Sequence, residues 1–259
     1  MLLLKIAQQN IFWTELLRRR REYAEVTREE AGAMTYGVRL HVWGERALFT
    51  RPETKVERVS YDVPTPSAAR GILEAIHWKP AIVWRIDRIH VLKPIRFASV
   101  RRNEVGAKAS TALALRAMRS GTLAGLGLSA EIERQQRAAT MLVDVGYVIE
   151  AHLEMTARAG DDAPVKHICM FNRRAAAGQC FHRPCLGTRE CPAEFALIPD
   201  GAPLPASSLP AEERERELGW MLYDIDFRPD RNEARFFRAR LSKGILDVRA
   251  CLAANEVVS

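Results

Sequence analysis

The sequence predicts an α+β protein, in which four strands and two helices alternate before a small all-β region. Three observations support this prediction. Alternating apolar and polar residues indicate strands, and apolar residues three to four apart indicate helices. The two patterns follow one another in the order strand, helix, strand, strand, helix, strand. This order is the βαββαβ plan of ferredoxin-like domains, which RRM-type domains share.

A strand and a helix open this plan. Residues 36–43 alternate between apolar and polar side chains, which predicts a half-buried strand. Thr65 and Pro66 are typical of a helix N-cap and a first helical residue, and apolar residues at helical spacing follow them. We therefore expect a helix over residues 66–78, with His77 in its last turn because a proline soon follows.

The remaining elements of the plan are two central strands, a second helix and a closing strand. A β-rich run covers residues 82–91, and the most regular alternation of the chain covers 143–155. Apolar residues at helical spacing predict a helix over 166–177, and residues 180–186 are the predicted closing strand. Between the central strands, residues 106–140 are rich in Ala, Arg and Gly and predict a partly helical excursion.

The composition divides the chain into three parts. Residues 1–33 contain an apolar segment followed by four arginines, an order opposite to that of a secretory signal, and are predicted to be an N-terminal extension or an upstream translation start. Residues 34–190 form the ferredoxin-like domain. Residues 191–259 are predicted to be a small antiparallel β subdomain, with strands at 220–227, 235–241 and 244–248.

Positive charge is concentrated in two segments of a chain with a net charge of +7. Residues 95–120 carry six Lys and Arg against one Glu, and residues 166–190 carry five against one. Such segments are typical either of a nucleic-acid partner or of solvated surface. The candidate phosphate contacts are Arg51, Lys55, Arg58, Arg101, Arg102, Arg173, Arg174 and Arg189. Trp43 and Trp78 could stack on bases, but we expect them in the core.

Five cysteines and the lack of a leader predict reduced thiols in the cytoplasm. No apolar run reaches the ~20 residues of a membrane span. A zinc site is a second possibility for the cysteines, but their spacing lacks the short C-x2-C pair of structural zinc sites. We therefore expect no metal and no cofactor, and expect the cysteines to be small buried apolar residues. The four clustered cysteines are Cys169, Cys180, Cys185 and Cys191.

The dipeptide Lys166-His167 is the strongest candidate for chemistry, because it stands at the predicted start of a helix. Free backbone N–H groups and the helix dipole attract an anion there. The ammonium group of Lys166 adds a point charge, and the imidazole of His167 can transfer a proton near neutral pH. A solvated surface pair is the alternative interpretation.

Three stretches of the sequence resemble a known family. Residues 36–80, from YGVRLHVW to EAIHWKP, residues 86–104, IDRIHVLKPIRFASVRRNE, and residues 166–195, KHICMFNRR to CPAEF, are similar to the fifth Cas family of CRISPR-associated proteins, Dvulg subtype, of type I-C systems. The resemblance covers most of residues 34–250.

The resemblance implies a pre-crRNA endoribonuclease. It implies metal-independent cleavage of the CRISPR repeat transcript beside its hairpin, with the protein staying on the crRNA 5′ handle. It also implies membership of a surveillance complex with backbone and large subunits, which brings target DNA into contact only indirectly. The family's catalytic set is a tyrosine at the end of the first helix with an adjacent lysine and histidine. The lysine and histidine correspond to Lys166 and His167, and the tyrosine position holds His77.

These residues suggest cleavage by the RNA's own 2′-OH. Lys166 would hold the phosphate, while His77 and His167 divide the base and acid roles, and the products would be a 2′,3′-cyclic phosphate and a 5′-OH. Two imidazoles predict a bell-shaped pH dependence near neutrality. The alternatives are a non-catalytic subunit that caps the 5′ handle and a general basic RNA- or DNA-binding module.

Overall fold

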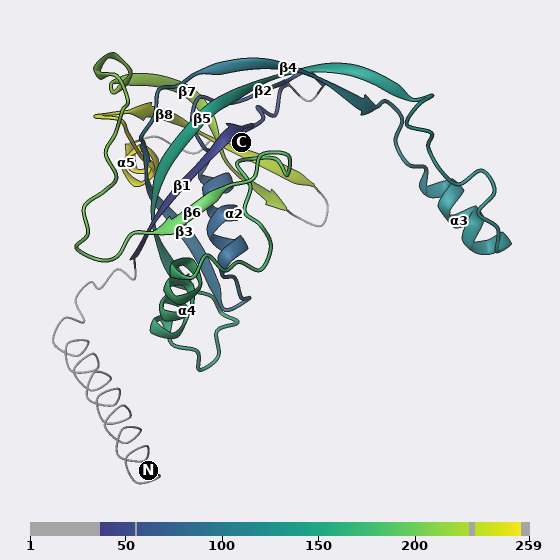
Figure 1. The fold of residues 1–259 in the computed structure, drawn as a ribbon. Helices are drawn as coiled ribbons and strands as arrows, with labels where there is room; N and C mark the ends of the chain where they lie inside the picture. The colour runs from purple at the N-terminus through teal and green to yellow at the C-terminus, as the bar shows by residue number, and fades with distance from the viewer. Residues whose placement is uncertain (1–36, 55, 228–230, 255–259) are drawn as a thin grey trace, which may run out of the picture. The chain divides into compact units, whose positions relative to one another are not determined.

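The computed structural model describes residues 37–54, 56–227 and 231–254. In this part of the chain, strands and helices form a mixed α+β body around one large sheet, with a separate two-stranded sheet (Figure 1). No helix within the described ranges is long and apolar enough to cross a membrane.

The main sheet has the strand order β6-β1-β5-β3-β9, and each of these neighbours is antiparallel. The two central strands are β1 (Gly37–Ala47) and β5 (Arg134–Met155). They are flanked by β3 (Ile82–Val91) on one side and β6 (Glu194–Leu197) on the other, and β9 (Ile245–Asp247) extends the edge beside β3. The predicted strands at 36–43, 82–91 and 143–155 are confirmed, and the first and last of them are longer than expected.

Two helices pack against the sheet and contact one another, as Figure 1 shows. They are α2 (Pro66–Ile76), which lies against β3, and α4 (Pro164–Ala176), which lies against β1 and β6. The predicted N-cap of α2 is confirmed, because the Thr65 hydroxyl accepts a hydrogen bond from the Ala68 N–H at 3.2 Å.

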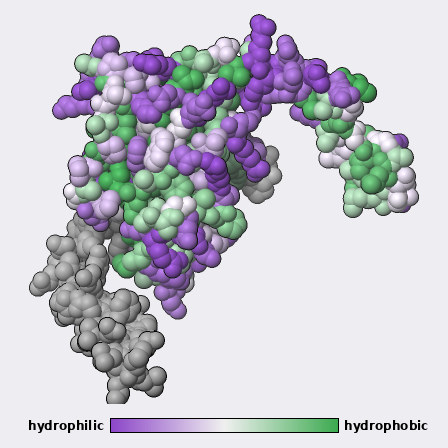
Figure 2. Space-filling view, viewed as in Figure 1, coloured by the Kyte–Doolittle hydropathy of each residue, from purple (hydrophilic) through white to green (hydrophobic). Residues whose placement is uncertain are grey.

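An arm projects from the sheet where β4 (Phe97–Val105) pairs with the first half of β5, and the short strand β2 (Arg58–Val59) also joins β5 there. The arm carries the helix α3 (Thr111–Ser120), none of whose residues is buried (Figure 1). Figure 2 shows apolar side chains at its tip, where Met118 is 80% exposed. The predicted excursion covered residues 106–140, but its last residues, 134–140, belong to β5.

The predicted closing strand at 180–186 is wrong, because this segment is a loop and the strand beside β1 is β6. Its backbone makes bonds outside the sheet: the Phe181 N–H donates to the Ala75 carbonyl of α2 at 2.8 Å, and the Leu186 carbonyl accepts from the Leu48 N–H at 2.9 Å. Gly187 follows in a left-handed conformation, with the Leu48 carbonyl so close that a Cβ would lie 2.1 Å from it.

The region after β6 pairs differently from the prediction. The strands β7 (Arg216–Phe227) and β8 (Asn232–Leu241) form the two-stranded sheet, preceded by the short 3-10 helix η1 (Ala211–Glu213). The third predicted strand contains β9, which joins the main sheet beside β3 instead. The chain then forms α5 (Val248–Ala254), a helix that the sequence patterns did not indicate.

The helix α2 ends one residue before His77, so the expectation that His77 lies in its last turn is wrong. His77 is extended, with φ −150° and ψ 118°. Its carbonyl accepts a hydrogen bond at 2.9 Å from the indole N–H of Trp84, which is buried in β3 and packs on Phe171 of α4 at 4.9 Å between ring centroids. Trp84 thereby ties α2, β3 and α4 together.

Replacing Trp84→Phe is expected to lower the free energy of unfolding by about 2–3 kcal/mol, because the His77 carbonyl loses its buried donor and packing is lost. Urea denaturation measures this change. Trp43→Phe is the matched control, since Trp43 is only partly buried and stacks on His41; its cost should stay below about 1 kcal/mol. Equal costs for the two variants would contradict the role given to the Trp84 N–H.

Candidate functional site

The structure brings two of the three predicted catalytic residues into contact. His77 follows α2 and His167 lies in the first turn of α4, 90 residues later, yet His77 Nε2 and His167 Nδ1 are 3.1 Å apart. The two rings stack with centroids 5.4 Å apart. Lys166, beside His167 in α4, forms an ion pair with Asp162, which precedes the helix.

Burial separates the two histidines from Lys166. The imidazoles of His77 and His167 are 0% and 1% exposed, whereas the Lys166 side chain is 54% exposed. The predicted set therefore consists of one accessible cation and two enclosed rings. A substrate can meet Lys166 directly but reaches His167 only after its surroundings move.

Arg174 of α4 determines which nitrogen of each ring carries the proton. Its Nη1 donates to the Ile76 carbonyl at 2.9 Å and lies 3.5 Å from His77 Nδ1, where a guanidinium favours an acceptor. The proton of neutral His77 is then on Nε2 and is donated to His167 Nδ1. The proton of neutral His167 is consequently on its Nε2.

This Nε2 of His167 is a buried polar atom without a hydrogen-bond partner in the described part of the chain. It lies 3.4 Å from Asp162 Oδ2, outside good hydrogen-bond geometry but close enough that His167 also contributes to the lowered pKa of the Asp162 carboxyl. Asp162 is instead engaged by the Lys166 ammonium group, which is the main reason why the pKa of the Asp162 carboxyl is lowered. Since unsatisfied buried donors are rare and costly, His167 Nε2–H is a donor that is available for a ligand.

Burial is the main cause that lowers the pKa of His77 from its ordinary value to about 4, and the charges of His167, Arg174 and Lys79 add to it. His77 is therefore neutral at pH 7. A neutral imidazole with both nitrogens already engaged is a poor proton donor and has no free lone pair. The site therefore presents donors, from Lys166 and His167, more readily than a base.

The predicted phosphate contacts fall into two groups. In the first group the guanidinium groups already have partners within the protein. Arg51 lies 3.4 Å from Asp62 and over the Tyr61 ring, and Arg174 points inward to His77. Arg58 and Arg102 belong to an ion-pair cluster. A second group is exposed and has no ion pair among the described residues: Arg101, Arg173 and Arg189. Lys55 lies outside the described residues.

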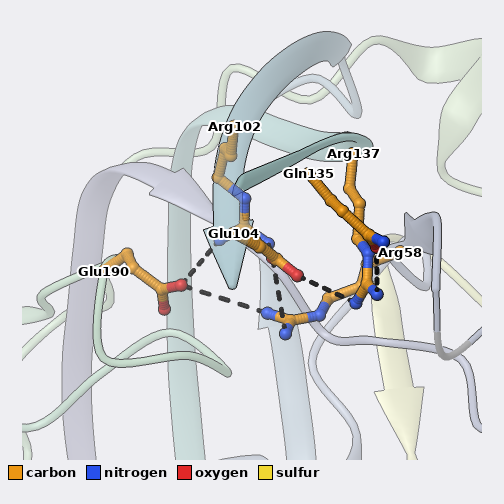
Figure 3. Close-up of polar contacts among 6 residues, drawn as sticks. All are labelled: Arg58, Arg102, Glu104, Gln135, Arg137 and Glu190. Atoms are coloured by element: carbon orange, nitrogen blue, oxygen red, sulfur yellow. Dashed lines mark hydrogen bonds and ion pairs between the residues drawn. The ribbon is translucent and has the colours of Figure 1, made fainter. Parts of the chain in front are cut away.

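The ion-pair cluster lies at the base of the arm (Figure 3). Arg102 of β4 donates to Glu190 at 2.6 Å and to Glu104 at 3.0 Å, while Arg58 of β2 and Arg137 of β5 also approach Glu104, at 3.6 and 3.3 Å. Three arginines thus share two carboxylates. The cluster joins the arm to the loop that contains Glu190 and leaves little free charge for a phosphate.

The cysteines are all free, and two of them contradict the expectation of burial, because Cys169 and Cys180 are exposed. Over the described ranges, no three His, Cys, Asp or Glu side chains are arranged to hold a metal ion.

The structure also contains a cavity of about 700 Å³ beside this site, which the sequence patterns did not indicate. The cavity is lined by α2, the end of α4 and the loop 181–187. Trp78, which we expected in the core, is 52% exposed at this cavity. The following Lys79-Pro80, a charged residue and a helix breaker, is the one local sequence signal that points to its exposure.

Comparisons with known proteins identify the family. A family model described as CRISPR-associated protein (Cas_Cas5) matches residues 37–249. The chain belongs to this family. It is 62% identical over 216 residues to the CRISPR pre-crRNA endoribonuclease Cas5d of Mannheimia succiniciproducens, covering 83% of this chain and 96% of that protein. It is 40% identical over 231 residues to the protein of the same name from Thermus thermophilus, covering 82% and 91%.

A solved structure of a CRISPR-associated protein has a similar fold, with a TM-score of 0.58, 22% identity and coverage of 88% of this chain and 100% of that chain. A second, a functionally uncharacterized protein from Streptococcus mutans, has a TM-score of 0.55 and 22% identity, covering 82% and 91%. These two structures share the fold described above.

15N NMR of histidine-labelled protein reports the tautomers of His77 and His167. At pH 7 we expect a neutral His77 with its proton on Nε2, and no protonation of this ring until the pH falls well below 6, because its pKa is near 4. Arg174→Met should abolish the single tautomer, whereas Arg174→Lys should retain it. Arg173→Met, at the exposed neighbouring position, is the control; an identical His77 spectrum in the Arg174→Met and Arg173→Met variants would refute the argument.

Proposed function

We propose that the chain is an endoribonuclease that cuts CRISPR repeat RNA beside its hairpin and remains on the crRNA 5′ handle as a subunit of a type I-C surveillance complex. The observation that carries the proposal is the 62% identity to a protein named as a pre-crRNA endoribonuclease, of which the match covers 96%. The contact between His77 and His167 beside Lys166 supports a catalytic centre there. The backbone and large subunits of the complex are its protein partners, and target DNA is met only through them.

The chemistry that suits these residues is attack of the 2′-OH on the adjacent phosphate without a metal ion, giving a 2′,3′-cyclic phosphate and a 5′-OH. The new bond from the 2′-oxygen to phosphorus replaces the bond to the 5′-oxygen; hydroxide takes the proton of the 2′-OH, and the leaving 5′-oxygen takes a proton from water. Negative charge grows on the phosphate oxygens in this reaction, and donors aimed at that charge lower the barrier. Lys166 supplies an ammonium group, and His167 supplies its unpaired Nε2–H. His77 is a positioning residue in this scheme, since it fixes the tautomer of His167.

Asp162 is the group that an incoming phosphate must replace. Its carboxylate is paired with Lys166 and lies 3.4 Å from His167 Nε2, so it covers the two donors that the phosphate needs. An RNA phosphate that takes its place would form the same charge-assisted contacts. This exchange also explains how an enclosed His167 becomes reachable.

The strand order β6-β1-β5-β3, with α2 and α4 as connections, supports a ferredoxin-like core. The predicted extension, residues 1–33, lies outside the described residues. We treat the arm as an insertion in the core. We draw the boundary to the C-terminal subdomain after Leu197, not at residue 190, because β6 pairs with β1; from that subdomain only β9, among the described strands, returns to the main sheet. Five free cysteines and an RNA substrate favour the cytoplasm.

Incubating the purified protein with its repeat RNA in EDTA should give a single cut with a 5′-OH on the downstream product. A 2′-deoxy substitution at the cut should abolish cleavage and leave binding intact, because it removes the nucleophile. His167→Ala should slow single-turnover cleavage about 100-fold, the usual cost of losing one donor to a developing anion. Cleavage of the deoxy substrate would overturn the mechanism.

The pH dependence distinguishes positioning from acid–base roles for His77. The low pKa of His77 keeps its imidazole neutral from pH 7 down to about 5. The titration of His77 therefore does not change the cleavage rate near neutral pH. We therefore expect a rate that rises with pH across neutrality, because hydroxide takes the proton of the 2′-OH, instead of the bell-shaped profile expected from two ordinary imidazoles. His77→Gln, which can donate to His167 but cannot transfer a proton, should keep most of the rate; a maximum near pH 7 that the Gln variant loses would show an acid–base role.

The second candidate function is a non-catalytic subunit that caps the 5′ handle. The burial of both imidazoles favours it. Tight binding of the repeat RNA in EDTA without any cut would establish this function in place of the first.

A further inference from the structure

The cavity beside the candidate site is formed by three parts of the chain that are distant in sequence. One wall is the outer face of α2 with the residues that follow it, Trp78 to Pro80; the others are Arg174 near the end of α4 and the loop 181–187. Its volume of about 700 Å³ is in the range of ligand sites. Arg174 lines this cavity and also contacts His77, so the cavity adjoins the candidate site.

Two aromatic side chains are exposed at the cavity. Phe181 is 87% exposed and Trp78 is 52% exposed. Two backbone hydrogen bonds anchor the segment that presents Phe181: the Phe181 N–H bonds to the Ala75 carbonyl at 2.8 Å, and the Gln179 N–H bonds to the Arg174 carbonyl at 2.8 Å. The fold therefore holds a large apolar ring in water at a fixed backbone position, which costs free energy unless a ligand covers it.

Gly71, in the middle of α2, lines the cavity and has no side chain to fill it. Glycine weakens a helix relative to alanine, and a Cβ at this position would meet nothing within 4 Å. Close packing therefore does not require glycine here. Its missing side chain instead keeps room above the helix.

The charged groups at the cavity favour an anionic ligand. Lys79 is exposed and forms no ion pair among the described residues, and Arg174 and Arg183 add two guanidinium groups. Arg183 is paired with Glu194. The one carboxylate at the lining, Glu74, lies 3.4 Å from Arg70, which Glu74 shares with Asp224. The cations at the lining, Lys79, Arg174 and Arg183, still outnumber it. Aromatic faces together with free cations are the combination that binds single-stranded nucleic acid.

We infer that the cavity binds an unpaired nucleobase of the repeat RNA next to the cut, stacked against Phe181 and Trp78, with Lys79 on the adjoining phosphate. The inference rests on the proposed function, and it adds a specificity site to it. RNA beside a hairpin is single-stranded and can turn a base outward, which a stacking site requires. The base would lie on one side of Arg174 and the histidine pair on the other.

The test measures the affinity of an uncleavable repeat RNA, with 2′-deoxy at the cut, by fluorescence anisotropy. Phe181→Ala should weaken binding about tenfold, the usual effect of losing one base stack. Gly71→Leu should fill the cavity and weaken binding similarly while raising the melting temperature or leaving it unchanged. The controls are Phe227→Ala, at a phenylalanine of β7 that is 74% exposed, and Gly71→Ala, both expected within about twofold of the parent.

Abasic substitutions along the single-stranded flank of the RNA identify the base concerned. One abasic position should weaken binding to the parent protein about tenfold and have little further effect on the Phe181→Ala variant. If cleavage is normal but Phe181→Ala and Gly71→Leu match their controls, the base site is wrong and the proposed function stands. If Phe181→Ala leaves the RNA affinity unchanged but prevents assembly with other subunits, the exposed ring contacts a protein and the inference is wrong. An RNA that is neither bound nor cut refutes the proposed function itself.

Discussion

The contact between His77 and His167 is the constraint on which the rest of the site depends. It requires that α2 end before residue 77, that α4 begin beside that end, and that both helices pack on the same sheet. Trp84 and Arg174 meet this requirement from β3 and α4 by bonding to the carbonyls of residues 77 and 76. Each of these bonds is partly or fully buried, where an unpaired carbonyl would be costly.

The same geometry gives the site its electrostatic character. Arg174 contacts His77, and His77 in turn contacts His167, whose buried Nε2 ends this series. Lys166 lies nearby, paired with Asp162. Donors prearranged around a place where charge develops are an efficient form of catalysis, because no reorganisation is needed during the reaction. Asp162 pairs this arrangement with an internal carboxylate.

Positive charge in this sequence has two different uses. Arg58 and Arg102 are paired with carboxylates and brace the arm, although they stand among the arginines that suggest nucleic-acid binding. Arg101, Arg173 and Arg189 are exposed and remain available to a polyanion. A charge count along the sequence cannot separate the two uses, because carboxylates from distant segments decide which arginines are neutralised.

The sequence by itself determined the local elements and the family. Alternation located β1, β3 and most of β5, Thr65 located the start of α2, and the Lys166-His167 pair was visible as a helix-start motif. These features depend on neighbours a few residues away. Only the tertiary structure decided that the closing strand is β6, that His167 meets His77 and is enclosed, and that a cavity opens beside Phe181. Such features depend on hydrogen bonds and packing between segments far apart in the chain, which no local pattern encodes.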